Sequence, residues 1–358
     1  MKPRVAMVGA TYPPIGASAA EALCHQAARC LADRGWTVRA LSSNDRLEDG
    51  DPPATKVDGI CVDRVLSLSA PPPKFSYRER ARITEANEHR TAAWLTEFRP
   101  DIVCFWGMAR LTVGPIRAAD EAGYPYAFVL CDDSLASYAP APWSRPWRAL
   151  PDHLLHRRAT LSELRVSPAT SLTEAIVDEL RRTFTDEFDP LLIHPGVPIA
   201  EWTPKLCPGE AHDPFRLLCV DRSSFEIAAQ VAEALGRRVA LRTVVGPWAK
   251  DLLAEYHEAD ALILSGGPPI LEAMACGTPV IGAEDAPLSE VLSHHRNALV
   301  VPQGDLEALS AAITRLIEDD DLREALATEG IRMVRSRFTF DRYVDDLERW
   351  LLKDVLHS

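Results

Sequence analysis

Short apolar runs alternate with longer amphipathic stretches along this chain, and the alternation restricts its fold more than any other feature. The first half contains RVAMVGA, TVRAL, DIVCFWG and YPYAFVLCDD, with periodic stretches such as 19–34 and 111–122 between them. The second half repeats the scheme with FRLLCVDR, RVALRTVVG, ADALILSGG, TPVIGAE and NALVVPQGD. A strand followed by a helix, repeated, predicts parallel strands joined by crossover helices, and two such series predict two doubly wound α/β sheets.

The length and one irregular segment divide the chain into two predicted domains. A chain of 358 residues is longer than a single hydrophobic core usually supports. The segment 195–214 is rich in proline, glycine and polar residues and lacks periodicity, as expected of a linker. We expect Rossmann-like domains over 1–195 and 196–339, with a terminal helix over 340–358 that packs back on the first domain.

Composition excludes several classes of protein. A formal net charge of -13 argues against a surface that grips nucleic acid, because such a surface needs a basic stripe. The eight cysteines form no CxxC pair, so neither a metal site nor a disulfide framework is expected. No apolar run approaches the length of a membrane span, and the short start before RVAMV does not resemble a signal peptide. These features predict a cytoplasmic enzyme.

The segment GGPPILEAMACGTPVIG, from Gly266 to Gly282, is the most informative local motif. It predicts a loop, a short helix that begins near Pro268, a stop at Gly277 and a buried strand. One reading is structural, since proline suits the first helical position and glycine suits the left-handed stop. The other is chemical, since Gly266 and Gly267 leave backbone N–H groups uncovered near a helix N-terminus, where a phosphate can approach. The local sequence leaves both readings open.

Several separated stretches together resemble one enzyme family. They lie in the family's order over nearly the whole chain: TYPPIGAS, LADRGWTVRAL, RPDIVCFWG, SPATS, IHPGV, EADALILS, LEAMACGTPVIG and NALVVPQGDLEALSAAI. The chain resembles the retaining nucleotide-sugar glycosyltransferases of the two-Rossmann GT-B type, in glycosyltransferase family 4, also called group 1. The resemblance implies a nucleotide-diphosphate sugar held by the C-terminal domain, an acceptor held by the N-terminal domain across a cleft, and transfer with retention and without a metal ion or other cofactor.

The resemblance also assigns roles to individual residues. Arg222 matches the arginine that neutralises the donor diphosphate, and Glu272 matches a glutamate whose carboxylate accepts both ribose hydroxyls. Gly246 lies where backbone groups contact the base. Gly266, Gly267 and Pro268 are expected to border the donor. The glycine-rich loop of the first domain, which approaches the diphosphate or the acceptor, corresponds to Gly16, Ala17 and Ser18.

Some positions depart from the family pattern. The first of two paired glutamates has no counterpart, because the loop around it is shortened to SGGPP. Cys131 stands where the family has histidine, and Asp132 follows it. Asp132 is read either as a group that positions the acceptor or as ordinary turn chemistry after a strand. Arg222, Gly16 and Asp132 are the predicted catalytic set.

The resulting hypothesis is a hexosyltransferase acting on a small soluble acceptor in a specialised biosynthetic pathway. One alternative is a related enzyme that joins an activated ring to an amine or a thiol. Another is a non-catalytic relative that binds a nucleotide or a partner enzyme. The stretch PWSRPWRALPDHLLHRR, 142–158, is interpreted as a solvated helix rather than a membrane-binding one. The sequence is compatible with either a monomer or a homodimer.

Overall fold

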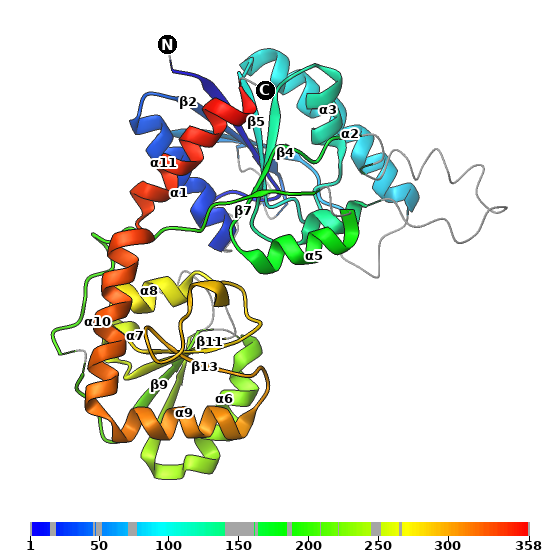
Figure 1. Ribbon diagram of the computed structural model, residues 1–358. Helices are drawn as coiled ribbons and strands as arrows, with labels where there is room; N and C mark the ends of the chain where they lie inside the picture. Colours follow the sequence, from blue (N-terminus) through cyan, green and yellow to red (C-terminus); the bar gives the residue numbers. More distant parts are fainter. Residues whose placement is uncertain are drawn as a thin grey trace. The chain divides into compact units, whose positions relative to one another are not determined.

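The computed structural model describes most of the chain as two compact units. The described residues are 2–14, 19–45, 47, 52–70, 77–139, 161, 164–184, 188–207, 209–220, 222–244, 252–264 and 267–356. Unit 1 comprises Met1–Leu172, Ile176–Ile193 and Asp346–Ser358, and unit 2 comprises Thr173–Ala175 and His194–Asp345. Each unit is a sheet with helices packed on it (Figure 1).

Unit 1 is built on an eight-stranded sheet in the order β3-β4-β2-β1-β5-β6-β7-β8. All neighbouring strands are parallel except β3 and β4, which form an antiparallel pair at one edge. This antiparallel edge differs from the parallel pairing that the sequence predicted. The strands are β1 Arg4–Gly9, β2 Thr37–Ser43, β3 Ala54–Val57, β4 Ile60–Leu66, β5 Ile102–Trp106, β6 Tyr126–Leu130, β7 Ala169–Ser171 and β8 Leu191–Leu192.

The helices of unit 1 connect these strands and cover the sheet. The buried residues of β1 and β5 pack with α2 and α3 in one apolar cluster. The helix α3 begins later than the predicted stretch 111–122, because its residue Pro115 fits only the first turn. The helical segments are α1 Ala19–Asp33, α2 Tyr77–Phe98, α3 Gly114–Glu121, the 3₁₀ turn η1 Ser134–Tyr138 and α5 Glu174–Phe184, whose first residues belong to unit 2.

The end of the chain returns to unit 1. Helix α11, Phe340–Trp350, continues into one irregular turn, η4 Leu351–Val355. The carboxylate of Glu348 accepts hydrogen bonds from Lys2 at 2.7 Å, from Arg34 at 2.9 Å and from the Trp36 indole at 2.8 Å. This side chain therefore ties the end of the chain to its beginning.

Unit 2 is a five-stranded, fully parallel sheet in the order β10-β9-β11-β12-β13. The strands are β9 Phe215–Cys219, β10 Val239–Thr243, β11 Ala261–Leu264, β12 Val280–Ala283 and β13 Leu299–Val301. The helical segments are α6 Arg222–Leu235, η2 Gly236–Arg238, α7 Leu252–Glu258, α8 Pro269–Ala275, η3 Ser289–Val291, α9 Leu306–Glu318 and α10 Asp320–Arg337.

Alternating strand residues divide the core of unit 2 into two layers. Leu218 and Leu262 face α7, α8 and α10, whereas Leu217 and Ile263 face α6 and α9. This division follows from the two-residue period of a strand. On the first face α10 holds α8 closely, since a Cβ added to Gly330 would lie 3.3 Å from Met274.

Candidate functional site in the second unit

The strand order of unit 2 marks one place for a ligand. The chain leaves β9 for β10 on one side and then returns to β11 on the other side of β9. Open α/β sheets bind ligands beyond the carboxyl ends of the strands at the point where the order reverses. Here that point lies between β9 and β11, where α6 and α8 begin.

The start of α8 differs from the phosphate-binding loop that the sequence suggested. The Gly267 N–H donates to the Pro287 carbonyl at 2.8 Å, and Pro268 and Pro269 have no N–H. The Ile270 N–H donates to the Gly267 carbonyl at 3.1 Å. The expectation of an uncovered amide is therefore wrong for Gly267, because the Pro287 carbonyl occupies its N–H and the two prolines that follow supply no donor. The structural reading of these prolines fits the observed helix start.

Glu272 is the charged side chain that α8 carries at this edge. Its Oε2 atom accepts a hydrogen bond from the Tyr256 hydroxyl at 3.0 Å. Burial raises the pKa of Glu272 to about 7, although the bond from Tyr256 opposes the shift. The carboxyl group is buried, while another part of the residue is accessible to solvent. A buried carboxylate with a raised pKa beside a ligand-binding edge is a candidate functional group.

Tyr256 is a buried residue of this site that the sequence did not predict. Its side chain is 0% exposed on α7, and its ring meets Trp202 edge to face at 5.5 Å. The Thr278 hydroxyl donates to the Tyr256 carbonyl at 2.6 Å. The only available signal was a tyrosine on the apolar face of a short helix, since a buried tyrosine hydroxyl usually finds a partner.

Several predicted site residues fall outside the described structure. Arg222 is the first residue of α6, directly after β9, but its side chain lies outside the described part. The backbone thus puts Arg222 at the same sheet edge as α8, and no contact is assigned to it. The predicted positions that lie outside the described residues altogether are Gly16, Ala17, Ser18, Gly246 and Gly266, together with the whole of the segment 142–158.

A buried network in unit 1 holds the segment that precedes the glycine-rich loop. The guanidinium of Arg64, which is 2% exposed, donates to the Pro13 carbonyl at 2.8 Å and to the Thr55 hydroxyl on β3. The Tyr12 hydroxyl lies 3.0 Å from His25 Nδ1, and His25 Nε2 lies 3.0 Å from Asp58. Residues 12 and 13 are therefore held from two sides just before the loop begins.

The structure gives Asp132 a role in a turn. Its Oδ1 accepts a hydrogen bond from the Ser134 N–H at 2.9 Å, which opens η1. This is the turn chemistry that the sequence offered as one of two readings. Cys131 is partly exposed as a residue, but desolvation of its thiol raises the pKa well above the usual range. Such a thiol is a poor nucleophile.

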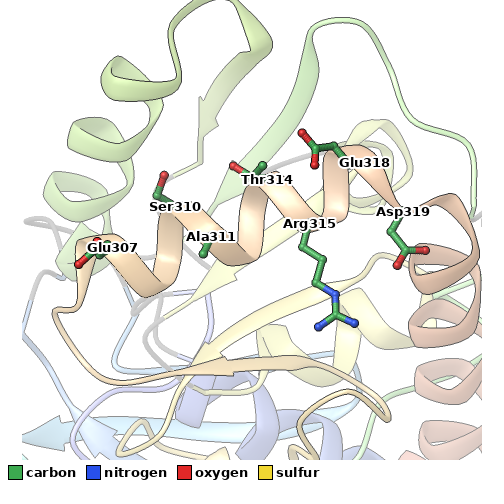
Figure 2. Close-up of a pocket in the computed structure, with 7 residues that line it drawn as sticks. All are labelled: Glu307, Ser310, Ala311, Thr314, Arg315, Glu318 and Asp319. Carbon is green, nitrogen blue, oxygen red and sulfur yellow. The ribbon is translucent and has the colours of Figure 1, made fainter.

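Two hollows of unit 2 add no catalytic group. A cavity of about 110 Å³ lies between the sheet and the starts of α6 and α9. It is lined mainly by apolar side chains, and its carboxylate, Asp305, caps α9 through the N–H groups of Glu307 and Ala308. Figure 2 shows a second hollow, along the exposed face of α9. Of its three carboxylates, Glu307 lies eleven residues from Glu318 on one helix, roughly 16 Å, and Asp319 accepts a hydrogen bond from the Leu322 N–H at 2.9 Å as the cap of α10, so the three do not form one site.

The described residues contain no group of three or more histidine, cysteine, aspartate or glutamate side chains arranged to hold a metal ion. None of their helices combines the length and apolar character that crossing a membrane requires.

Family models match both halves of the chain. The model described as "Glycosyl transferase 4-like domain" matches residues 18–196, and the one described as "Glycosyl transferases group 1" matches residues 210–333. The second match includes β9, α8 and Glu272, and the first covers most of unit 1.

Curated relatives match parts of the chain. A lipopolysaccharide core biosynthesis glycosyltransferase, LpsD of Rhizobium meliloti, is 29% identical over 153 residues, which are 40% of this chain and 44% of that protein. A D-inositol 3-phosphate glycosyltransferase of Salinispora tropica is 33% identical over 123 residues, which are 33% of this chain and 25% of that protein. The matches thus span less than half of these relatives.

Solved structures resemble the chain over its whole length. HepE of Anabaena, solved in complex with UDP and glucose, superposes with a TM-score of 0.72 and 16% identity, over 98% of this chain and all of that chain. At this identity the likeness establishes the fold. Two parallel-sheet α/β domains of the GT-B type are thereby confirmed.

Proposed function

The chain belongs to the GT-B glycosyltransferases with a glycosyl transferase 4-like domain, and on this premise we propose that it moves a sugar, with retention, from a nucleotide-diphosphate sugar to a small soluble acceptor. The observation that carries the proposal is Glu272, a buried carboxylate at the edge of the sheet where the strand order reverses. Its Oε1 atom has no hydrogen-bond partner among the described residues and is available to a ribose hydroxyl.

The transfer step requires charge stabilisation more than it requires an acid or a base. Positive charge develops on the sugar ring and negative charge on the leaving diphosphate, so a guanidinium near the diphosphate stabilises the transition state. In this proposal Arg222 supplies that charge and the acceptor passes its proton to the leaving phosphate. Asp132 then acts through the turn that it caps and not as the base.

The proposal extends to a hexosyl donor, to transfer without a metal ion, and to a cytoplasmic role in a specialised biosynthetic pathway. HepE was solved with UDP and glucose, and the curated relatives carry the names of sugar transferases. These names support a nucleotide-sugar donor for this chain.

A thermal-shift screen with UDP, GDP, dTDP and ADP tests the donor site. A ligand at 100 times its dissociation constant adds about 2.7 kcal/mol to the stability of the native state, so one diphosphate should give a clear shift. We expect Arg222→Ala to lose at least about tenfold in affinity, since hydrogen bonds to charged groups contribute roughly 1.5–3 kcal/mol.

The matched control is Arg237→Ala. Arg237 lies in η2, just before the amino end of β10, and therefore at the opposite edge of the same sheet. We expect this variant to bind like the wild type. If no diphosphate shifts the wild-type protein, or if both arginine variants weaken binding equally, the proposed donor site is wrong, and a non-catalytic binding role becomes the better hypothesis.

A further inference from the structure

The hydroxyl of Tyr256 is a buried polar group that the proposed chemistry does not yet use. It lies on α7, sixteen residues before Glu272, and its only hydrogen-bond acceptor in the described structure is Glu272 Oε2 at 3.0 Å. The pairing joins two helices on the same face of the sheet, α7 and α8. A phenylalanine would fill the same space, so the hydroxyl itself needs an explanation.

The contacts of both partners restrict the carboxylate to one orientation. Tyr256 is restrained, because it is fully buried, its ring packs on Trp202 and its carbonyl accepts from Thr278. The backbone of α8 is held by α10 through Met274 and Gly330. With Oε2 bound to a fixed hydroxyl, the Oε1 atom has a fixed direction as well.

We propose that Tyr256 is the positioning residue that orients the Glu272 carboxylate toward the two ribose hydroxyls of the nucleotide. The inference rests on the proposed function and assigns to this site a preference for ribonucleotides over 2′-deoxyribonucleotides. A carboxylate that rotates freely can accept one hydroxyl in many ways, whereas an oriented one distinguishes a pair of hydroxyls from a single hydroxyl. Such sites reject an analogue that lacks a hydroxyl because a buried polar group is then left unpaired.

The ionisable surroundings of Glu272 are consistent with this role. Tyr256 on α7 donates to it, and Cys276 follows four residues later, directly after the end of α8. Burial and then the Glu272 charge raise the pKa of the Cys276 thiol to about 12, while Lys205, which donates to the Ala259 carbonyl at 2.7 Å, opposes that rise. Burial raises the pKa of Glu272 to about 7, and among the described side chains the Tyr256 bond is the contribution that favours the ionised form.

The experiment measures the dissociation constants of UDP and 2′-deoxy-UDP by calorimetry between pH 6 and pH 9, with the GDP pair used instead if the screen selects GDP. Wild-type protein should prefer the ribonucleotide on the order of tenfold at pH 8. In Tyr256→Phe the preference should fall below about threefold. The pH at which affinity reaches half its maximum should also rise, since Glu272 then loses the bond that favours its charge.

The control is Tyr343→Phe, which removes the hydroxyl of a buried tyrosine on α11 and should leave the preference unchanged. Should Tyr256→Phe be insoluble, Glu272→Asp serves in its place, because the shorter side chain cannot keep the hydrogen bond. The inference is wrong if Tyr256→Phe weakens the binding of both nucleotides equally and keeps the wild-type preference for the ribonucleotide and the wild-type pH midpoint.

A comparison of two variants distinguishes the proposed donor site from the positioning role of Tyr256. If Glu272→Ala abolishes the ribose preference and Tyr256→Phe does not, the donor site stands and the positioning role is wrong. If the wild-type protein binds neither nucleotide, both the proposed function and the inference fail.

Discussion

At the scale of single residues, Glu272 is predicted to lower the stability of the native state at neutral and alkaline pH. Its pKa is raised to about 7 by burial, against a usual value of 4.5, so the native state binds more protons than the unfolded state between these values. Stability should therefore fall as the pH rises from 4.5 to 7. Glu272→Gln removes the titration and should stabilise the protein by on the order of 2 kcal/mol at pH 8, with little effect at pH 4.5.

Urea unfolding at the two pH values measures this difference. Glu233→Gln, an exposed position on α6, is the matched control and should change the free energy of unfolding by less than about 0.5 kcal/mol at either pH. An equal effect of Glu272→Gln at pH 4.5 and pH 8 would contradict the argument. The gain in stability is expected to accompany a loss of nucleotide binding, as is usual where a site carries a destabilising charge.

Residue patterns predicted some parts of this site and missed others for physical reasons. Gly277 was expected to end α8, and it has a φ of 74°, which glycine adopts without strain. Glu272 was identified through its motif. Tyr256 was not, because periodicity predicts which face of a helix is buried and not which polar group meets another across two helices. The occupied Gly267 N–H depends on the distant Pro287 carbonyl, which local sequence does not reveal.

At the scale of elements, the Glu348 carboxylate is predicted to hold the terminal helix on unit 1. Burial alone would raise its pKa, but hydrogen bonds from Lys2, Trp36 and Arg34 lower it to about 2. A lowered pKa means that the stabilisation is complete above about pH 4.5 and is lost as the pH falls toward 2. Glu348→Gln should cost on the order of 2 kcal/mol at pH 7 and much less at pH 2.

Denaturant unfolding at pH 7 and at low pH tests this prediction. Glu97→Gln is the control, because Glu97 also pairs with an arginine, Arg39, but is 67% exposed. Exposed pairs contribute about 0–1 kcal/mol, so its effect should be small. If both variants lose the same free energy of unfolding at pH 7, burial of Glu348 with its three donors adds nothing to stability.

Elements were predicted best where local signals and packing agree. Helix α9 begins at Leu306 because the Asp305 side chain caps its first turn, and aspartate is a favoured cap residue that the sequence displays directly. The antiparallel edge formed by β3 and β4 was missed, since the pairing of an edge strand depends on the tertiary fold more than on its own sequence. Through Arg64, that edge also reaches the Pro13 carbonyl beside the glycine-rich loop.

At the scale of the whole molecule, the path of the chain predicts that the two units differ when they are separated. Unit 2 is nearly continuous, since His194–Asp345 supplies all of it apart from three residues. Unit 1 needs the end of the chain, because Asp346–Ser358 belongs to it and includes the buried side chains of Leu347, Trp350 and Leu351. A fragment of residues 194–345 should therefore unfold cooperatively and bind the diphosphate selected by the screen, while a fragment of residues 1–193 exposes apolar surface.

The matched comparison joins residues 346–358 to the fragment 1–193 through a flexible glycine-serine linker. Burying three large apolar side chains contributes roughly 1.5–3 kcal/mol each before the entropy of ordering the helix is subtracted, so the joined form should be clearly more stable. Urea unfolding monitored by circular dichroism measures the difference. If the fragment 1–193 unfolds at the same urea concentration as the joined form, the terminal helix does not stabilise unit 1. Glu348→Gln in the joined form should then also have no effect, which makes this prediction and the one for Glu348 succeed or fail together.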